Sequence, residues 1–422
     1  MLPTLGDHPR LRLAILCLLY LAQGLPYGFV TVALAAHLAA HGADAAAIGG
    51  VIAMAILPWS FKWAWGPLVD SGRLAALGRR RPWIMVAQAM MILTAAGIAW
   101  VPAGDVPLLG WVVLVHNLFV GLQDVAVDAL AVDQLEGRDR ERASGMMYGA
   151  SHLGTFLGGA GLGVLTARLG LGTAIVALAT MQLVILLVVI LIRERPEDAF
   201  LAAWRGRPAD VAEPVHTRPG VIGIARALAR AMTAPAALRA AAAALLMKLL
   251  PATLMVLMTV HLIDTLGWSQ ERFSTVTGGF GILLGLAASI GGGWLASRIG
   301  PRATAIGANM ALAVAWIAFA CAAPWWDRSA PVFAWVAADT VCQAATTVAL
   351  FAIFMRVASP AVAATQFTAS MAIMNLATSA GSALAGPLGQ LIDVPTAFLI
   401  AGLLQPLAGF LLPAVEHDTA ER

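Results

Sequence analysis

Long apolar stretches recur through almost the whole chain, and they constrain its fold more than any other feature. A helix that crosses a membrane needs about 20 mostly apolar residues, and only 12% of the 422 residues are charged, about half the share usual in a soluble domain. We therefore predict an all-α integral membrane protein with twelve transmembrane helices. The predicted spans are residues 13–39, 47–69, 83–102, 108–132, 145–167, 171–192, 240–266, 273–297, 303–324, 330–357, 363–391 and 396–413.

The arginines are divided unequally between the two sides of the predicted membrane. If both termini lie on one side, that side carries twenty-one arginines, and the other carries only Arg168, Arg272 and Arg328. Positive residues accumulate in cytoplasmic loops, so we expect both termini in the cytoplasm. The same distribution explains the basic character of the chain without a nucleic-acid partner.

A long polar segment divides the predicted spans into six and six. It covers residues 193–239, is rich in Arg, Glu, Asp and Pro, and predicts a cytoplasmic linker between six-helix bundles at 1–192 and 240–422. The segments GPLVD (66–70) and GWLAS (293–297) follow the second helix of each half, and arginines come after both. Parallel repeats of this kind are expected of the major facilitator fold, which places its binding site where the repeats meet.

Two further segments have more than one interpretation. Residues 221–232 of the linker predict either a short amphipathic helix on the membrane surface or a partly ordered tether. Glycines four residues apart, Gly154 with Gly158 and Gly159 with Gly163, permit close approach of helices. We interpret them as packing residues, because a phosphate-binding glycine loop needs a preceding strand.

Four motifs in the first half of the chain resemble those of one transporter family. They are QGLPYG (23–28), FKWAWGPLVD (61–70), GRRRPW (78–83) and LQDVAVDA (122–129). Together they resemble the AmpG-like branch of the major facilitator superfamily, which includes muropeptide permeases, acetyl-CoA transporters and siderophore importers of the rhizobactin and pyochelin type. The resemblance is strong in the first half and weak in the second, and it implies an importer.

Ionisable residues inside predicted spans indicate where the functional site lies. A charge within the bilayer costs on the order of 3 kcal/mol, so it usually faces a cavity or a partner. Lys62 and Lys248 are the only lysines, and both fall within spans, although Lys248 could instead snorkel to the cytoplasm. Asp124 and Asp128 lie one turn apart at a depth similar to that of Lys62, and we expect a Lys62–Asp124 pair. That pair could act as a gate or as a proton or substrate site.

The other candidate residues come from helices that line the cavity in this fold. The polar residues of the fourth predicted helix fall within an arc of about 140°, and this face should line the cavity. The candidates for the substrate or proton pathway are Tyr20, Gln23, Tyr27, Lys62, His116, Asn117, Gln123, Asp124, Asp128, Lys248, His261, Asp339 and Gln343. The residues expected to form a cytoplasmic gate are Asp70, Arg79, Arg80, Arg81 and Asp133.

These observations favour a secondary transporter over a membrane-embedded enzyme or a passive scaffold. The sequence offers no cluster of nucleophile, base or metal ligands, and it carries buried charges on several helices. We expect a monomeric, proton-coupled importer of a bulky polar small molecule in a bacterial-type inner membrane, without enzymatic activity, cofactor or metal. A chain that stops after twelve spans favours a siderophore or its iron complex; the alternatives are an anhydro-muropeptide and an acyl-CoA-type solute or export.

Overall fold

Helices dominate the structure, a computed structural model that describes residues 4–5, 8–70, 78–102, 104–135, 137–194, 221–359 and 362–413. Within these ranges the one β-type pairing is a bridge between Thr4 and Arg193. Each of the twelve predicted spans contains a helix, and nine helical segments of the described part are long and apolar enough to cross a membrane. The prediction of an all-α integral membrane protein is confirmed, while the number of crossings and the side of the termini stay predictions.

The chain forms two compact units that exchange two short segments. The first unit consists of residues 1–41, 54–215 and 269–279, and the second of residues 42–53, 216–268 and 280–422. The predicted halves therefore supply most of each unit. Residues 42–53 nevertheless pack with the second unit and residues 269–279 with the first.

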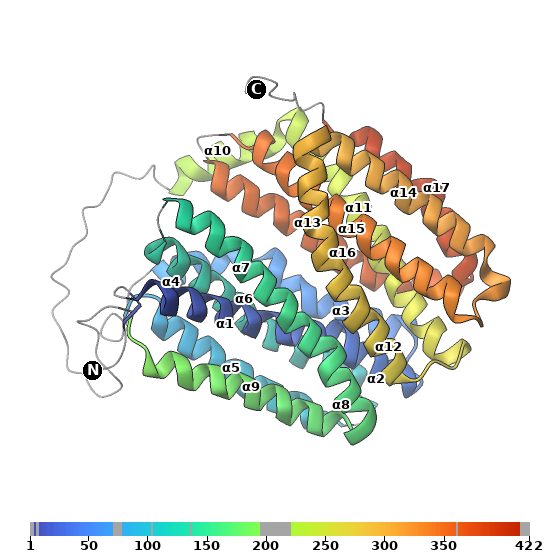
Figure 1. The fold of residues 1–422 in the computed structure, drawn as a ribbon, viewed down its shortest axis with the longest axis horizontal. Helices are drawn as coiled ribbons and strands as arrows, with labels where there is room; N and C mark the ends of the chain where they lie inside the picture. Colours follow the sequence, from blue (N-terminus) through green and yellow to red (C-terminus); the bar gives the residue numbers. More distant parts are fainter. Residues whose placement is uncertain are drawn as a thin grey trace. The chain divides into compact units, whose positions relative to one another are not determined.

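The helices of the first unit pack mainly around α1. α1 lies against α7 and α6, and α5 lies between α6 and α9, as Figure 1 shows. The elements are α1 (Pro9–Gly28), η1 (Phe29–Leu34), α2 (Ala35–Ala40), η2 (Lys62–Trp65), α4 (Gly66–Asp70), α5 (Arg81–Ala99), α6 (Val106–Gln134), α7 (Gly137–Phe156), η4 (Leu157–Gly161), α8 (Leu162–Leu169), α9 (Leu171–Leu191) and α12 (Gln270–Phe273). α3 (Ala45–Ser60) belongs to this unit from residue 54 onward.

Glycines bring α1 and α7 into backbone contact. A Cβ added at Gly24 would lie 2.0 Å from the Ser151 carbonyl oxygen, and one added at Gly158 would lie 2.0 Å from the Leu25 carbonyl oxygen. Gly28 and Gly154 are equally close to the opposite helix, at 2.1 Å. The predicted close approach through the small residues of α7 is therefore confirmed.

The exchanged segments have packing reasons of their own. In the first unit a Cβ at Gly163 would lie 2.4 Å from the Ser274 side chain, so the segment after α12 sits directly on α8. In the second unit Ser379 Oγ donates a 2.8 Å hydrogen bond to the Ala53 carbonyl oxygen, and a Cβ at Gly386 would meet Ala46 at 2.4 Å.

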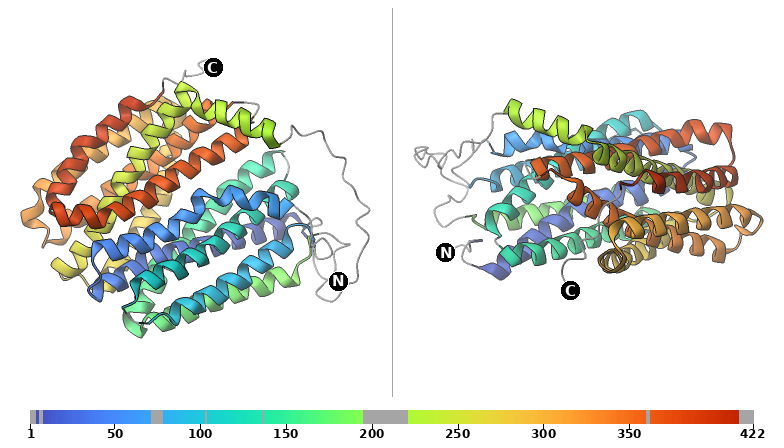
Figure 2. Two further views of the ribbon diagram at one scale, coloured as in Figure 1. Left: turned by 180° about the vertical axis from the view of Figure 1, so that it is seen from behind. Right: turned by 90° about the horizontal axis from the view of Figure 1, so that it is seen from above.

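The second unit is built from two groups of packed helices. α11 lies against α16, and α14 lies between α15 and α17, as can be followed in Figure 2. Its elements are α10 (Val221–Thr233), α11 (Pro235–Val260), η5 (His261–Thr265), α13 (Ile282–Ile299), α14 (Pro301–Cys321), η7 (Ala323–Trp325), α15 (Ser329–Val357), α16 (Ala363–Leu391) and α17 (Val394–Leu411), and η6 (Ser274–Gly281) runs from the first unit into the second. Of the two interpretations of residues 221–232, the structure supports a helix.

Candidate functional site

A break in the second predicted span positions Lys62. Pro58 lies near the end of α3, and a proline inside a helix removes one hydrogen bond and crowds the preceding turn. The helix ends at Ser60, and Lys62 opens the 3-10 turn η2. From there its Nζ reaches Asp124 Oδ2 on α6 at 2.8 Å and lies 5.9 Å from the centre of the Trp59 ring. The pair that the sequence predicts is thus formed.

A tyrosine holds the second carboxylate of α6. The Tyr20 hydroxyl of α1 donates a short hydrogen bond to Asp128 Oδ1. The Tyr20 ring also packs edge-on against the Tyr148 ring of α7, with centroids 5.8 Å apart. Four elements, α1, η2, α6 and α7, therefore meet at one set of side chains. We name Tyr20, Lys62, Asp124, Asp128 and Tyr148 the Lys62 cluster.

The charges of the Lys62 cluster do not balance. Two carboxylates face one ammonium, so the cluster carries one net negative charge when Lys62, Asp124 and Asp128 are ionised and both tyrosines are neutral. The side chains of Lys62 and Asp124 are only 15% and 7% exposed, and charge is costly at such sites. Uptake of a single proton by either carboxylate would bring the net charge to zero.

His116 and Asn117, on the same helix, have partners inside the bundle. His116 is fully buried, and its Nδ1 lies 2.9 Å from the Thr94 hydroxyl of α5. Asn117 Nδ2 donates to the carbonyl oxygen of Val113, one turn earlier, at 3.0 Å. These contacts explain the two polar residues by helix packing and do not require that they line a cavity.

Gln123 also joins helices. Its Nε2 donates to the Leu19 carbonyl oxygen of α1 at 3.0 Å, and its Oε1 accepts from Gln88 Nε2 of α5 at 2.8 Å. Gln23 is buried beside this contact region of α1, whereas Tyr27 is 43% exposed. Neither residue belongs to the Lys62 cluster.

The predicted cytoplasmic gate contains an ion pair at the end of α6. Arg80 Nε lies 2.8 Å from Asp133 Oδ2, and Arg80 Nη1 donates to the Val69 carbonyl oxygen at 3.1 Å. Arg79 is half-buried. The side chain of Asp70 lies outside the described residues.

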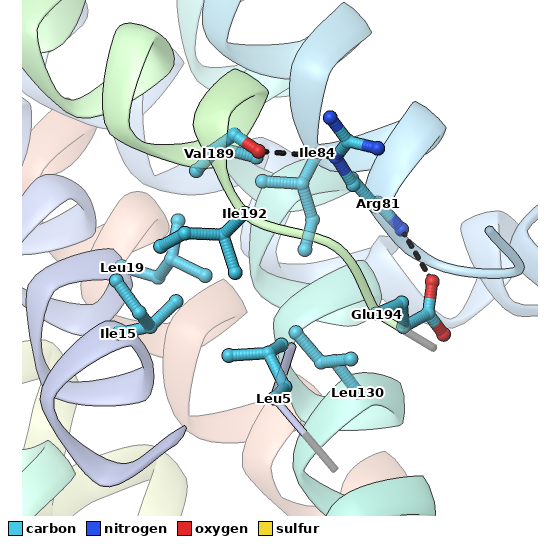
Figure 3. Close-up of a pocket in the computed structure, with 9 residues that line it drawn as sticks. All are labelled: Leu5, Ile15, Leu19, Arg81, Ile84, Leu130, Val189, Ile192 and Glu194. Carbon is cyan, nitrogen blue, oxygen red and sulfur yellow. Dashed lines mark hydrogen bonds between the residues drawn. The ribbon is translucent and has the colours of Figure 1, made fainter. Parts of the chain in front are cut away.

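Glu194 is a member of this region that sequence analysis did not identify. Its Oε2 accepts hydrogen bonds from the backbone N–H groups of Arg80 and Arg81 at 2.9 and 3.2 Å. Arg81 Nε donates to the Val189 carbonyl oxygen at 3.0 Å, as Figure 3 shows. Glu194 lies in the charge-rich stretch interpreted as linker, and only its burial, at 2% exposure, distinguishes it from its neighbours.

The apolar side chains beneath Arg81 enclose a cavity of about 20 Å³ (Figure 3). Its lining includes Ile15, Leu19 and Leu130. A space of this size holds about one water molecule. This region is therefore a packed junction between α1, α5, α6 and the end of α9, and not a pocket for a solute.

The second unit has a polar row of its own on α15. Asp339 Oδ1 accepts from Trp316 Nε1 at 2.9 Å, and Asp339 Oδ2 accepts from Gln343 Nε2 at 2.7 Å. One turn further along, the Thr347 hydroxyl accepts from Lys248 Nζ of α11 at 2.6 Å. His261 lies apart from this row, with its ring 5.2 Å from the Trp326 ring.

Acidic, histidine and cysteine side chains are the usual protein ligands of metal ions. The described residues contain no group of three or more such side chains placed to hold a metal ion. His37 and His41 are neighbours, with ring centroids 4.1 Å apart. Two imidazoles without a further ligand do not make up the usual coordination of zinc.

Comparison with known proteins identifies the family. The sequence model of the BT1 family matches residues 23–283, which is more than half of the chain. The chain belongs to the BT1 family. An anhydromuropeptide permease of Escherichia coli is 26% identical to this BT1-family chain over 149 residues, 35% of this chain and 30% of the permease. An uncharacterized membrane protein of Saccharomyces cerevisiae is 32% identical over 123 residues, 29% of this chain and 20% of the yeast protein.

The BT1-family chain therefore aligns with less than a third of the length of these two relatives. Among solved structures, the nucleoside transporter NupG superposes with a TM-score of 0.72 over 95% of this chain and 98% of NupG, at 14% identity. This likeness shows the major facilitator fold. The expected resemblance to AmpG-like transporters is confirmed, and the protein is a multi-pass membrane transporter of the major facilitator type.

Proposed function

We propose that this BT1-family chain is a proton-coupled secondary transporter and that the Lys62 cluster is its coupling site. The observation that carries the proposal is one buried ammonium, 2.8 Å from Asp124, beside a second carboxylate, Asp128, that Tyr20 holds. Buried ionisable groups within transmembrane helices are typical of proton relays and ion pathways. The cluster has one negative charge in excess and so a direct electrostatic reason to take up one proton.

Protonation would also change what holds Lys62. With Asp124 neutral, the ammonium loses its ion pair with that residue and keeps only the charge of Asp128 in the cluster, and the 3-10 turn between α3 and α4 allows the lysine to turn toward it. The Tyr20 hydroxyl and the Tyr148 ring link the same charges to α1 and α7. Proton binding would thus reach four elements at once, as a two-state coupling device requires.

The solute that we propose first is an anhydro-muropeptide. A relative that aligns with 35% of the chain is an anhydromuropeptide permease, and the sequence motifs resemble the same branch. The alternative solute is a siderophore, which rests on the family resemblance. The experiment below compares the two solutes. We infer import across an inner membrane from the family resemblance, and the arginine distribution supports both termini in the cytoplasm. The transporters among the relatives support a role without enzymatic activity.

Proteoliposomes containing the purified chain would test the proposal. Labelled anhydro-muropeptide and a labelled ferric siderophore are supplied separately, with and without an imposed proton gradient. We expect gradient-dependent accumulation of the anhydro-muropeptide, lost in Asp124→Asn and kept in Asp327→Asn, which changes an exposed aspartate outside the cluster. If only the siderophore accumulates, the proposal of an anhydro-muropeptide as the solute is wrong and the siderophore takes its place. Uptake that ignores the gradient, or that persists in Asp124→Asn, would refute the coupling.

A further inference from the structure

The two lysines of the chain have different partners. Lys62 Nζ lies 2.8 Å from a carboxylate oxygen of Asp124. Lys248, near the middle of α11, donates instead to the neutral Thr347 hydroxyl at 2.6 Å. Across the described ranges this is the one hydrogen bond of its ammonium, and the ion pairs found there do not include Lys248. Among the described residues, the direct hydrogen-bond partner of this positive charge within a predicted span is therefore a neutral oxygen.

Asp339, on the same face of α15 as Thr347, does not neutralise this charge directly. Eight residues separate Asp339 from Thr347, about 12 Å along a helix. Both carboxylate oxygens of Asp339 are already engaged, by Trp316 Nε1 at 2.9 Å and by Gln343 Nε2 at 2.7 Å. These two donors fix the carboxylate, which attracts the Lys248 ammonium electrostatically but forms no direct ion pair with it among the described residues.

Thr347 fixes the position of the lysine head. Its hydroxyl donates its own hydrogen to the Gln343 carbonyl oxygen at 2.7 Å, so a lone pair faces the ammonium. Lys248 is thereby held against α15. An ammonium has three N–H donors, so two are left for another acceptor, and the Lys248 side chain is only partly buried.

We propose that Lys248, held by Thr347, binds a carboxylate of the transported solute. The inference rests on the proposed function and adds to it that the solute must carry a negative charge. An anion at Lys248 would supply the directly bonded counter-ion that the described part of the site does not provide. A carboxylate adds the attraction between opposite charges to its hydrogen bond with the ammonium, whereas a neutral amide offers the hydrogen bond alone, so Lys248 discriminates a carboxylate from its neutral amide.

The test compares two probes on the purified full chain in detergent. One probe is the anhydro-muropeptide with free carboxylates, and the other is the same compound with its carboxylates amidated; binding is measured calorimetrically. The wild-type chain should bind the acid at least about tenfold more tightly, because the attraction between opposite charges at a partly buried site exceeds the ~1.4 kcal/mol that corresponds to tenfold in affinity. Lys248→Gln should bind both probes alike. Arg298→Gln, which removes a charge beside the Trp294 ring, should keep the preference.

Thr347→Val is a second variant that retains the lysine. It removes the oxygen that holds the ammonium and should weaken the preference for the acid. If Lys248→Gln does not fold, this variant still tests whether the Lys248 site binds the carboxylate. A preference that survives in both variants would overturn the inference, as would a wild-type chain that binds the two probes equally; transport itself would remain supported. A wild-type chain that binds neither probe would contradict the proposed solute and this inference together.

Discussion

Replacing Gly158 by alanine should separate α1 from η4, the continuation of α7, and destabilise the first unit. The added Cβ would lie 2.0 Å from the Leu25 carbonyl oxygen and 2.9 Å from the Phe29 nitrogen. Cβ atoms keep at least 3.0 Å from such neighbours, so the helices must move apart by about 1 Å. Both obstacles are backbone atoms, which cannot rotate away. Overpacking of this kind costs typically about 1–3 kcal/mol, and we expect a loss at the upper end of that range.

Gly161 provides the matched control on the next turn of the same span. A Cβ there would meet nothing within 4 Å, and alanine is favoured over glycine in a helix by about 0.8–1 kcal/mol. Thermal unfolding of the purified variants in one detergent should give a clearly lower Tm for Gly158→Ala and an equal or slightly higher Tm for Gly161→Ala. Equal Tm values for Gly158→Ala and the wild type would refute the close contact between α1 and η4.

Three further predictions concern charged side chains outside the Lys62 cluster. Arg80→Gln removes the buried partner of Asp133 and should destabilise the chain by about 3 kcal/mol, the lower end for a buried ion pair because the Asp133 side chain is 23% exposed. The effect is seen as a lower Tm, and a Tm equal to that of Asp327→Asn would contradict it. Hydrogen bonds from Thr396 lower the pKa of Asp393 from its usual value, so the cap stabilises at neutral pH and is lost as the pH falls through that lowered pKa. The Tm deficit of Asp393→Ala should therefore shrink on acidification, and a constant deficit would argue against the cap. Arg168 and Glu271 form an exposed ion pair, so Glu271→Gln should lower the Tm only slightly and only at low salt.

The sequence predicted the helical architecture because membrane helices have a strong signal. Each must be long and apolar, since lipid offers no hydrogen bonds to the backbone. The Lys62–Asp124 pair could also be predicted, because similar depth in the membrane and opposite charge on neighbouring helices leave few other partners. The family and the fold could be predicted because the motifs around Lys62, Asp124 and Asp128 resemble those of a known transporter family.

Contacts that depend on helix rotation could not be predicted. Both Tyr20 and Asp128 were candidates, but the hydrogen bond between them depends on how α1 and α6 turn toward each other, which hydropathy does not encode. His116 and Gln123 shared a polar face with the aspartates, and the structure gives them partners on α5 and α1. A polar face on a helix predicts that its side chains form hydrogen bonds. The partners can be neighbouring helices or a solute in a cavity, and the sequence pattern does not distinguish the two.

The position of Glu194 could not be predicted for a different reason, which is that its partners are distant in the sequence. Its sequence surroundings are those of a solvated linker, and its burial follows from a contact with backbone N–H groups more than 110 residues earlier in the chain. The exchange of residues 42–53 and 269–279 between the units is of the same kind. It follows from glycine contacts, such as that of Gly163 with Ser274, that no local pattern specifies.

The most direct test of the proposed coupling is to follow protons and solute together. Proteoliposomes containing the wild-type chain are suspended in weakly buffered medium without an imposed gradient, and anhydro-muropeptide is added while the external pH is recorded. Coupled entry predicts a rise in external pH that accompanies uptake in the wild type and in Asp327→Asn, and no rise in Asp124→Asn. Uptake by the wild type without any proton movement would contradict the role of the Lys62 cluster.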